Sequence, residues 1–311
     1  MTSLARHNTP ITLIGLICST VVALIFYFFY GELANQQATL MSLVLGFGLQ
    51  LSIWLLNDKF GNFSLSLLLS LSGIVILALV PHGIILFSLL SLGLAIVFIR
   101  QIWANKLNCP QFKDIKSLSS GWLTVILGIT YGIIVFVSTS SQVGDGLINE
   151  KIRQFTLNPD TLFHSSMSLM IRNYFTVSTG LHGLVKVHYH FLSHGLYAYT
   201  SQLLRIEPYE VYGYTNFIVF APLLITSWLN VLASIRSDSK YSFAICNLIL
   251  IGGPLSQSFG YLWSSHFISE SYLLGLILLA GITYSFIRFV EKNTISAQDL
   301  FLSVIYIFSV S

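Results

Sequence analysis

The sequence predicts an all-α fold: a polytopic membrane helix bundle of about 8–9 transmembrane helices, with interfacial helices in one long extracytoplasmic segment. Hydrophobic residues make up 54% of the 311 residues and charged residues only 9%, whereas a soluble domain carries about 25% charged residues. The mean hydropathy is +0.77. Apolar runs of about 20 residues, enough to cross a hydrocarbon core of about 30 Å, recur along the chain. Together these observations indicate an integral membrane protein.

The expected spans follow directly from those apolar runs. They lie at 11–30, 38–57, 63–81, 83–101, 120–139, 215–234, 241–260 and 270–289. The first is longer than the apolar region of a signal peptide, which has about 7–15 residues. It ends in the aromatic sequence FYFFYGE, which is typical of a membrane boundary, so we interpret it as an uncleaved span. A last apolar run, 300–310, is too short to span a bilayer, so we expect the sequence to end partway through a longer protein.

These spans divide the chain into three regions. Residues 1–139 form an N-terminal five-helix membrane region, and residues 140–214 form the extracytoplasmic segment. Residues 215–311 form C-terminal membrane helices that we expect to be truncated.

Loop charge predicts the orientation. With the N-terminus in the cytoplasm, the inner loops 1–10, 58–62, 102–119, 235–240 and 288–298 carry nine basic residues, and the short outer loops carry none. This asymmetry is typical of the positive-inside rule. Segment 140–214 is therefore predicted to face outward, and we expect the protein in the inner (plasma) membrane of a bacterium.

Several functional classes are disfavoured. No basic cluster or aromatic nucleic-acid-binding pattern is present, so no nucleic-acid partner is expected. The cysteines Cys18, Cys109 and Cys246 are scattered and odd in number, which fits neither a disulfide framework nor a thiolate metal site.

Polar and titratable residues concentrate between 158 and 214, which holds five of the eight histidines. The sequence Asn158-Pro159-Asp160 is typical of a helix start, with a cap, a proline in the first turn and an acid facing the positive end of the dipole. Apolar residues then recur at three- and four-residue steps, which predicts an amphipathic interfacial helix at 159–175. Gly180 and Gly183 predict a turn, and a second helix is expected at 187–204.

Asp160 and His164 are the candidate catalytic residues, because a spacing of four places them on one helix face. Three chemistries remain open. The carboxylate could act as a general base for an acceptor hydroxyl, carboxylate and imidazole could share a divalent cation, the one candidate cofactor, or the histidines of HxHxxxH could bind zinc or iron. The sequence leaves the metal unknown. The structural alternatives are a capping charge for Asp160 and an interfacial polar residue for His164.

The candidate substrate-binding residues lie in the same segment. Basic side chains there suit an anionic phosphate, the histidines suit a polar groove lining, and tyrosine suits a boundary between water and lipid. Simple anchoring to headgroups and interfacial histidines are the alternatives. The candidates are Arg172, Lys186, His188, Tyr189, His190 and His194. His82, in the sequence VPHG at the end of a span, is interpreted as structural.

The succession DTLFH (160–164), STGLHG (178–183), HYHFLSH (188–194) and PYEVY (208–212) between spans resembles polytopic membrane glycosyltransferases of the GT-C type. The resemblance covers about 55 residues. It implies an inverting sugar transfer from a polyprenyl-phosphate donor, in which Asp160 activates the acceptor and His164 or Arg172 lies near the phosphate. Two features depart from that pattern: about five spans precede Asp160, and Thr161 stands where many members have a second acid.

The predicted function is therefore a membrane glycosyltransferase that acts on the extracytoplasmic face, with membrane lipid and a polyprenyl-phosphate sugar donor as partners. The alternative is a non-enzymatic lipid or polysaccharide transporter, flippase or assembly component. A third hypothesis is a histidine-ligated metal oxidoreductase. The oligomeric state is not predicted by any pattern in the chain.

Overall fold

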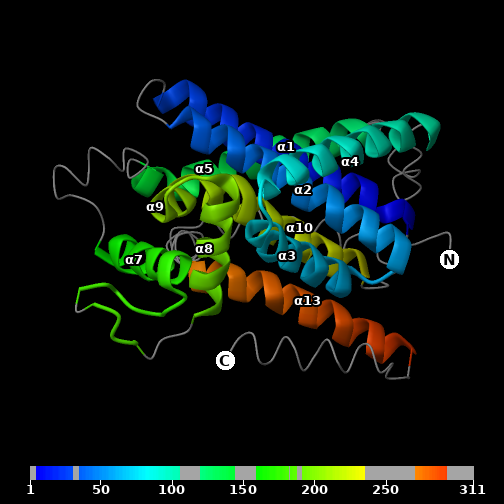
Figure 1. Cartoon of the computed structure of the whole chain (residues 1–311). Helices are drawn as coiled ribbons and strands as arrows, with labels where there is room; N and C mark the ends of the chain where they lie inside the picture. Colours follow the sequence, from blue (N-terminus) through cyan, green and yellow to red (C-terminus); the bar gives the residue numbers. More distant parts are fainter. Residues whose placement is uncertain are drawn as a thin grey trace.

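The computed structural model is all-helical in the part of the chain that it describes (Figure 1). The described residues are 5–30, 35–105, 120–143, 159–181, 183–187, 191–234 and 270–292. Their longer helices are α1 (Ala5–Tyr30), α2 (Gln36–Phe60), α3 (Phe63–Leu79), α4 (Gly83–Asn105), α5 (Ser120–Val143), α7 (Pro159–Tyr174), α8 (Leu192–Leu204), η4 (Val211–Phe220), α10 (Ala221–Ser234) and α13 (Glu270–Lys292). The single turn α9 (Pro208–Glu210) precedes η4.

Among the described residues, five helical stretches are long and apolar enough to cross a membrane, which confirms the predicted membrane class. They are Thr9–Phe28, Gln36–Phe60, Gly83–Trp103, Pro208–Ser234 and Tyr272–Val290. The spans expected at 63–81 and 120–139 correspond to shorter apolar helices, Phe63–Leu79 and Trp122–Val137. The span expected at 241–260 and the run 300–310 lie outside the described residues, so the total of eight or nine stays a prediction.

Local sequence explains where α2 and α3 begin and end. Asn35 and Asn62 are their N-caps, and their side-chain oxygens accept hydrogen bonds from the backbone N–H groups of Ala38 and Leu65 at 3.0 and 3.1 Å. Gly61 ends α2 with a φ of 63°, a left-handed conformation that glycine adopts without a steric penalty. The chain therefore reverses between α2 and α3 within two residues.

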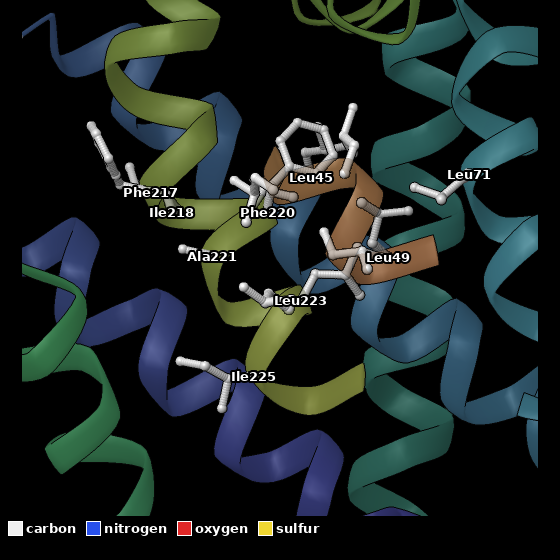
Figure 2. Packing of buried hydrophobic residues seen from close by; sticks show 14 of the residues in the cluster. Leu45, Leu49, Leu71, Phe217, Ile218, Phe220, Ala221, Leu223 and Ile225 are labelled. Atoms are coloured by element: carbon white, nitrogen blue, oxygen red, sulfur yellow. The ribbon is translucent and has the colours of Figure 1, made fainter. Parts of the chain in front are cut away.

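The helix Pro208–Ser234, built from α9, η4 and α10, forms the centre of the bundle, since 78% of its apolar window is buried inside the protein. It contacts α1, α2 and α13. Figure 2 shows Phe220 and Leu223 of this helix beside Leu45 and Leu49 of α2. The hydroxyl groups of Ser42 and Thr215 lie 2.8 Å apart, and Gln50 donates to Thr226 at 3.1 Å. Interhelical polar contacts of this kind stabilise helix pairs in membranes.

The central helix starts seven residues before the predicted 215, and its middle is unusual. Pro208 starts it with a capping box made by Glu207 and Glu210. Val211–Phe220 has π-helical hydrogen bonding, which is rare and widens the helix. The next turn contains Pro222, which has no N–H to offer the carbonyl of Ile218 and whose ring clashes with a normal α-helical turn. The wider π-helical turns accommodate that proline.

Glycines allow two close helix contacts. A Cβ on Gly132 of α5 would lie 2.7 Å from the Cβ of Val21 of α1, and a Cβ on Gly128 would lie 2.7 Å from that of Ile17. Small residues at helix interfaces let backbones approach closely in membranes. The α1–α5 contact therefore depends on these two positions having no side chain.

Candidate functional site

Helix α7 carries the predicted catalytic residues and begins where the sequence indicated, at Pro159. It packs against α8 and α9. Figure 1 shows it, in green, at the end of the bundle where α9 begins. That placement agrees with a helix located at one boundary of the membrane-spanning helices.

The buried face of α7 contains both apolar residues and serines. Met167 and Ile171 are buried, but Phe163 and Tyr174 are exposed. Ser168 is fully buried, and its hydroxyl lies 3.4 Å from that of Tyr212. The aromatic residues Phe163 and Tyr174 lie on the outside of the protein. The helix is confirmed, and the contact of its exposed aromatic residues with lipid stays a prediction.

Two candidate histidines meet between α7 and α8. The Nδ1 atom of His164 lies 2.9 Å from the Nε2 atom of His194, and their ring centroids are 5.1 Å apart. His194 is fully buried and also lies 3.4 Å from the hydroxyl of Ser193. One ring nitrogen must carry the proton and the other must accept it. The pair is therefore a proton-sharing contact that fixes the position of His164.

This pairing was not evident from sequence spacing, which grouped His194 with His190 four residues before it. The residues that meet are 30 apart in the chain. His188, Tyr189 and His190 lie outside the described residues, as does His182. The predicted lining by HxHxxxH therefore stays a prediction.

Asp160 lies in the first turn of α7, one helical turn before His164. The helical backbone confirms the four-residue relationship that the prediction assumed. The side chain of Asp160 is outside the described set, and its contacts are not assigned.

Arg172 connects α7 to the chain between α8 and α9. Its Nη2 forms an ion pair with Glu207 at 2.9 Å, and its Nη1 donates to the carbonyl oxygen of Ile206 at 3.1 Å and to Ser201 at 3.4 Å. A phosphate at Arg172 would have to compete with these acceptors. The guanidinium group of Arg172 therefore joins α7 to the chain around Ile206 and Glu207.

Lys186 is exposed in the segment that follows α7. The turn predicted there is confirmed: Gly180 and Gly183 have φ values of 75° and 73° and form an isolated bridge. Ser178 donates to the carbonyl oxygen of Gly183 at 2.9 Å. This turn fixes the conformation of residues 178–183. Lys186 follows the turn, where solvent or lipid headgroups can reach it.

Sequence reasoning missed a buried polar cluster at the same end of the bundle. Glu210 is 7% exposed and accepts hydrogen bonds from the side-chain amide of Asn35 and from the backbone N–H of Glu207. The backbone N–H of Asn35 donates to the hydroxyl of Tyr214 at 2.9 Å. The sequence signal was the Glu-Pro-x-Glu pattern, which is a capping box around Pro208. The cluster joins the start of α2 to the start of the central helix.

The described residues contain no group of three or more His, Cys, Asp or Glu side chains positioned to hold a metal ion. A divalent cation would therefore need at least one ligand whose side chain is not among those described, such as Asp160, His188 or His190. Two histidines alone do not complete the ligand set of a structural zinc site, which has four ligands.

Comparison of the chain with protein-family models, with curated proteins and with solved structures gave no match. The fold and the apolar helices define the class, an all-helical membrane protein. The functional argument therefore rests on the geometry of the residues around α7 and α8.

Proposed function

We propose that this protein is a multi-pass membrane glycosyltransferase of the GT-C type. It would transfer a sugar from a polyprenyl-phosphate donor to an acceptor hydroxyl on the extracytoplasmic face. The observation that carries the proposal is the placement of Asp160 and His164 one turn apart on α7, with His164 held by the buried His194. A carboxylate and an oriented imidazole at the boundary of apolar helices are the groups that acid–base chemistry on a lipid-linked substrate requires.

The reaction follows from these roles. Asp160 accepts the proton of the acceptor hydroxyl while that oxygen attacks the anomeric carbon of the sugar. The bond between the anomeric carbon and the phosphate oxygen breaks, and the polyprenyl phosphate leaves with the bonding electrons. Attack from the opposite face inverts the configuration. His194 holds the imidazole of His164 beside the reacting groups, and Lys186 offers a positive charge for the phosphate.

The proposal places α7 and α8 on the extracytoplasmic side of the membrane. Basic residues such as Lys59 at the end of α2 and Arg100 near the end of α4 would then face the cytoplasm, in keeping with the positive-inside rule. The proposal includes about eight or nine spans in a bacterial plasma membrane, as the apolar runs predict.

A test uses the full-length protein in liposomes that contain radiolabelled polyprenyl-phosphate glucose or mannose, with cell-envelope glycans as acceptors. Asp160→Asn should lower sugar transfer by about 100-fold or more, the lower end of general acid–base contributions. The matched control is Asp58→Asn, which neutralises an exposed acid at the other end of the bundle. Chelation with EDTA in a parallel arm tests the divalent cation.

Wild-type transfer by Asp160→Asn would remove the assigned base. The second candidate is a non-enzymatic transporter, flippase or assembly component that binds lipid or polysaccharide. It is favoured by the contacts of Arg172, whose charge is satisfied by Glu207 within the protein. Saturable binding of the labelled lipid without any turnover by the wild-type protein would support this second function.

A further inference from the structure

A cavity of about 190 Å³ lies where the ends of α3 and α8 meet the start of α4. Its polar lining comes from His82, Gln202 and Arg205, and its apolar lining includes Leu77, Val80 and Ile84. Gln202 is eight residues after His194 on α8, which corresponds to about 12 Å along the helix axis. The cavity is therefore separate from the His164–His194 contact.

Two residues of this cavity have an uncommon backbone conformation. His82 and Arg205 have φ values of 60° and 56°, in the left-handed region that residues other than glycine rarely occupy. His82 lies between α3 and α4, and Arg205 ends α8. These two turns bring polar side chains from segments 123 residues apart in the chain (205 minus 82) to one cavity. Arg205 is the left-handed C-cap of α8, and its backbone N–H donates to the carbonyl oxygen of Ser201.

The charge in this cavity is not neutralised by the protein residues that the structure describes. Within those residues, Arg205 forms no ion pair, and the nearby carboxylate of Glu207 is bound by Arg172. Guanidinium groups bind phosphate with two parallel hydrogen bonds, and imidazole and amide groups add further donors. The lining therefore matches an anionic phosphate.

The surroundings favour a phosphate that belongs to a lipid. The cavity lies at the ends of apolar helices, where headgroups are expected if these helices cross a bilayer. Apolar side chains are exposed beside it, at Leu79 on α3 and at Ile85 and Leu86 in the first turn of α4. A lipid tail can lie along this exposed surface while its phosphate occupies the cavity.

We propose that this cavity binds the phosphate group of a membrane lipid, with Arg205 as the principal ligand and His82 and Gln202 as additional donors. The lipid tail lies along the exposed face at the start of α4. This site does not depend on the sugar-transfer proposal, because that proposal gives none of the lining residues a role.

The test measures equilibrium binding of radiolabelled phosphatidic acid to the full-length protein in detergent. Parallel arms use polyprenyl phosphate, diacylglycerol as a tail without phosphate, and inorganic phosphate as an anion without a tail. Arg205→Gln should weaken phosphatidic acid binding at least tenfold, and Arg205→Lys should weaken it less because the charge remains. His82→Asn should weaken it about threefold, because the imidazole donor is lost. The variant should still fold, because asparagine tolerates the left-handed backbone.

The matched control is Arg100→Gln, which removes an exposed arginine 17 residues after Gly83 on α4, about 26 Å away along the axis. It should bind like the wild type. Preferential binding of either phospholipid over diacylglycerol, lost in Arg205→Gln, supports the site, and the stronger of the two lipids identifies its source. If Arg205→Gln does not purify as a folded protein, Arg205→Lys and His82→Asn provide the comparison.

The proposal is overturned if the cavity variants bind phosphatidic acid as tightly as Arg100→Gln does. Equal affinity for diacylglycerol would show that the tail alone is recognised. Equal affinity for inorganic phosphate would show a free-anion site in place of a lipid site.

Discussion

The imidazoles of His164 and His194 meet at 2.9 Å between α7 and α8, and only His194 is fully buried. This contact joins the helix that carries Asp160 to a helix that packs on the central bundle. A boundary helix is thereby attached to the bundle through a polar contact as well as through apolar packing. The position of the candidate base therefore depends on a residue 34 positions later in the chain, as the numbers 160 and 194 show.

Replacing His194 should detach α7 from α8. His194→Ala leaves a fully buried cavity and a partner nitrogen without its hydrogen bond, which we expect to cost about 1–3 kcal/mol. Hydrogen exchange of the α7 amides should rise, measured by mass spectrometry on the protein in nanodiscs. Asp58→Asn, which alters an exposed residue at the other end of the bundle, is the control, and unchanged α7 exchange in His194→Ala would contradict a structural role for the pair.

Glu210 should matter more for stability than Glu207. Glu210→Gln replaces an acceptor of two hydrogen bonds with an amide that can satisfy only part of the cluster, so we expect a loss of about 1–2 kcal/mol. Glu207 is 51% exposed, and its ion pair with Arg172 should contribute about 0.5 kcal/mol. Thermal unfolding of Glu210→Gln and Glu207→Gln measures the difference, and equal midpoints would contradict it.

Glycine substitutions should separate packing from helix propensity. Gly132→Ala places a Cβ 2.7 Å from the Cβ of Val21, and we expect the overpacking to cost about 1–3 kcal/mol. Gly93→Ala meets no atom within 4 Å and should be neutral or stabilising by up to about 1 kcal/mol. The thermal unfolding midpoints of Gly132→Ala and Gly93→Ala, measured in one detergent, compare the two effects. An unchanged midpoint for Gly132→Ala would show that α1 and α5 can move apart.

Single cysteines should report the orientation. In a background without Cys18, Cys109 and Cys246, a cysteine at Lys186 should react with an impermeant maleimide in intact cells. A cysteine at Lys59 should react only after the membrane is permeabilised, because basic loops remain inside. The reverse pattern would place α7 in the cytoplasm and remove the proposed extracytoplasmic reaction.

The start of α7 and the turn at Gly180 were predictable because their determinants are local. Pro159 fixes the start of α7 at its first residue, and a positive φ favours glycine. The partners of His164 and Arg172 were not predictable, because they lie 30 and 35 residues away and depend on how α7 packs on α8 and α9.

The sequence by itself determined that this is a helical membrane protein, since the length and apolarity of a span are set by the bilayer and can be counted along the chain. Only the tertiary structure decided which polar groups meet. The His164–His194 contact, the buried Glu210 and the cavity of His82 and Arg205 all join distant segments. Where a buried polar group bonds across helices, helix packing sets which partner is within reach.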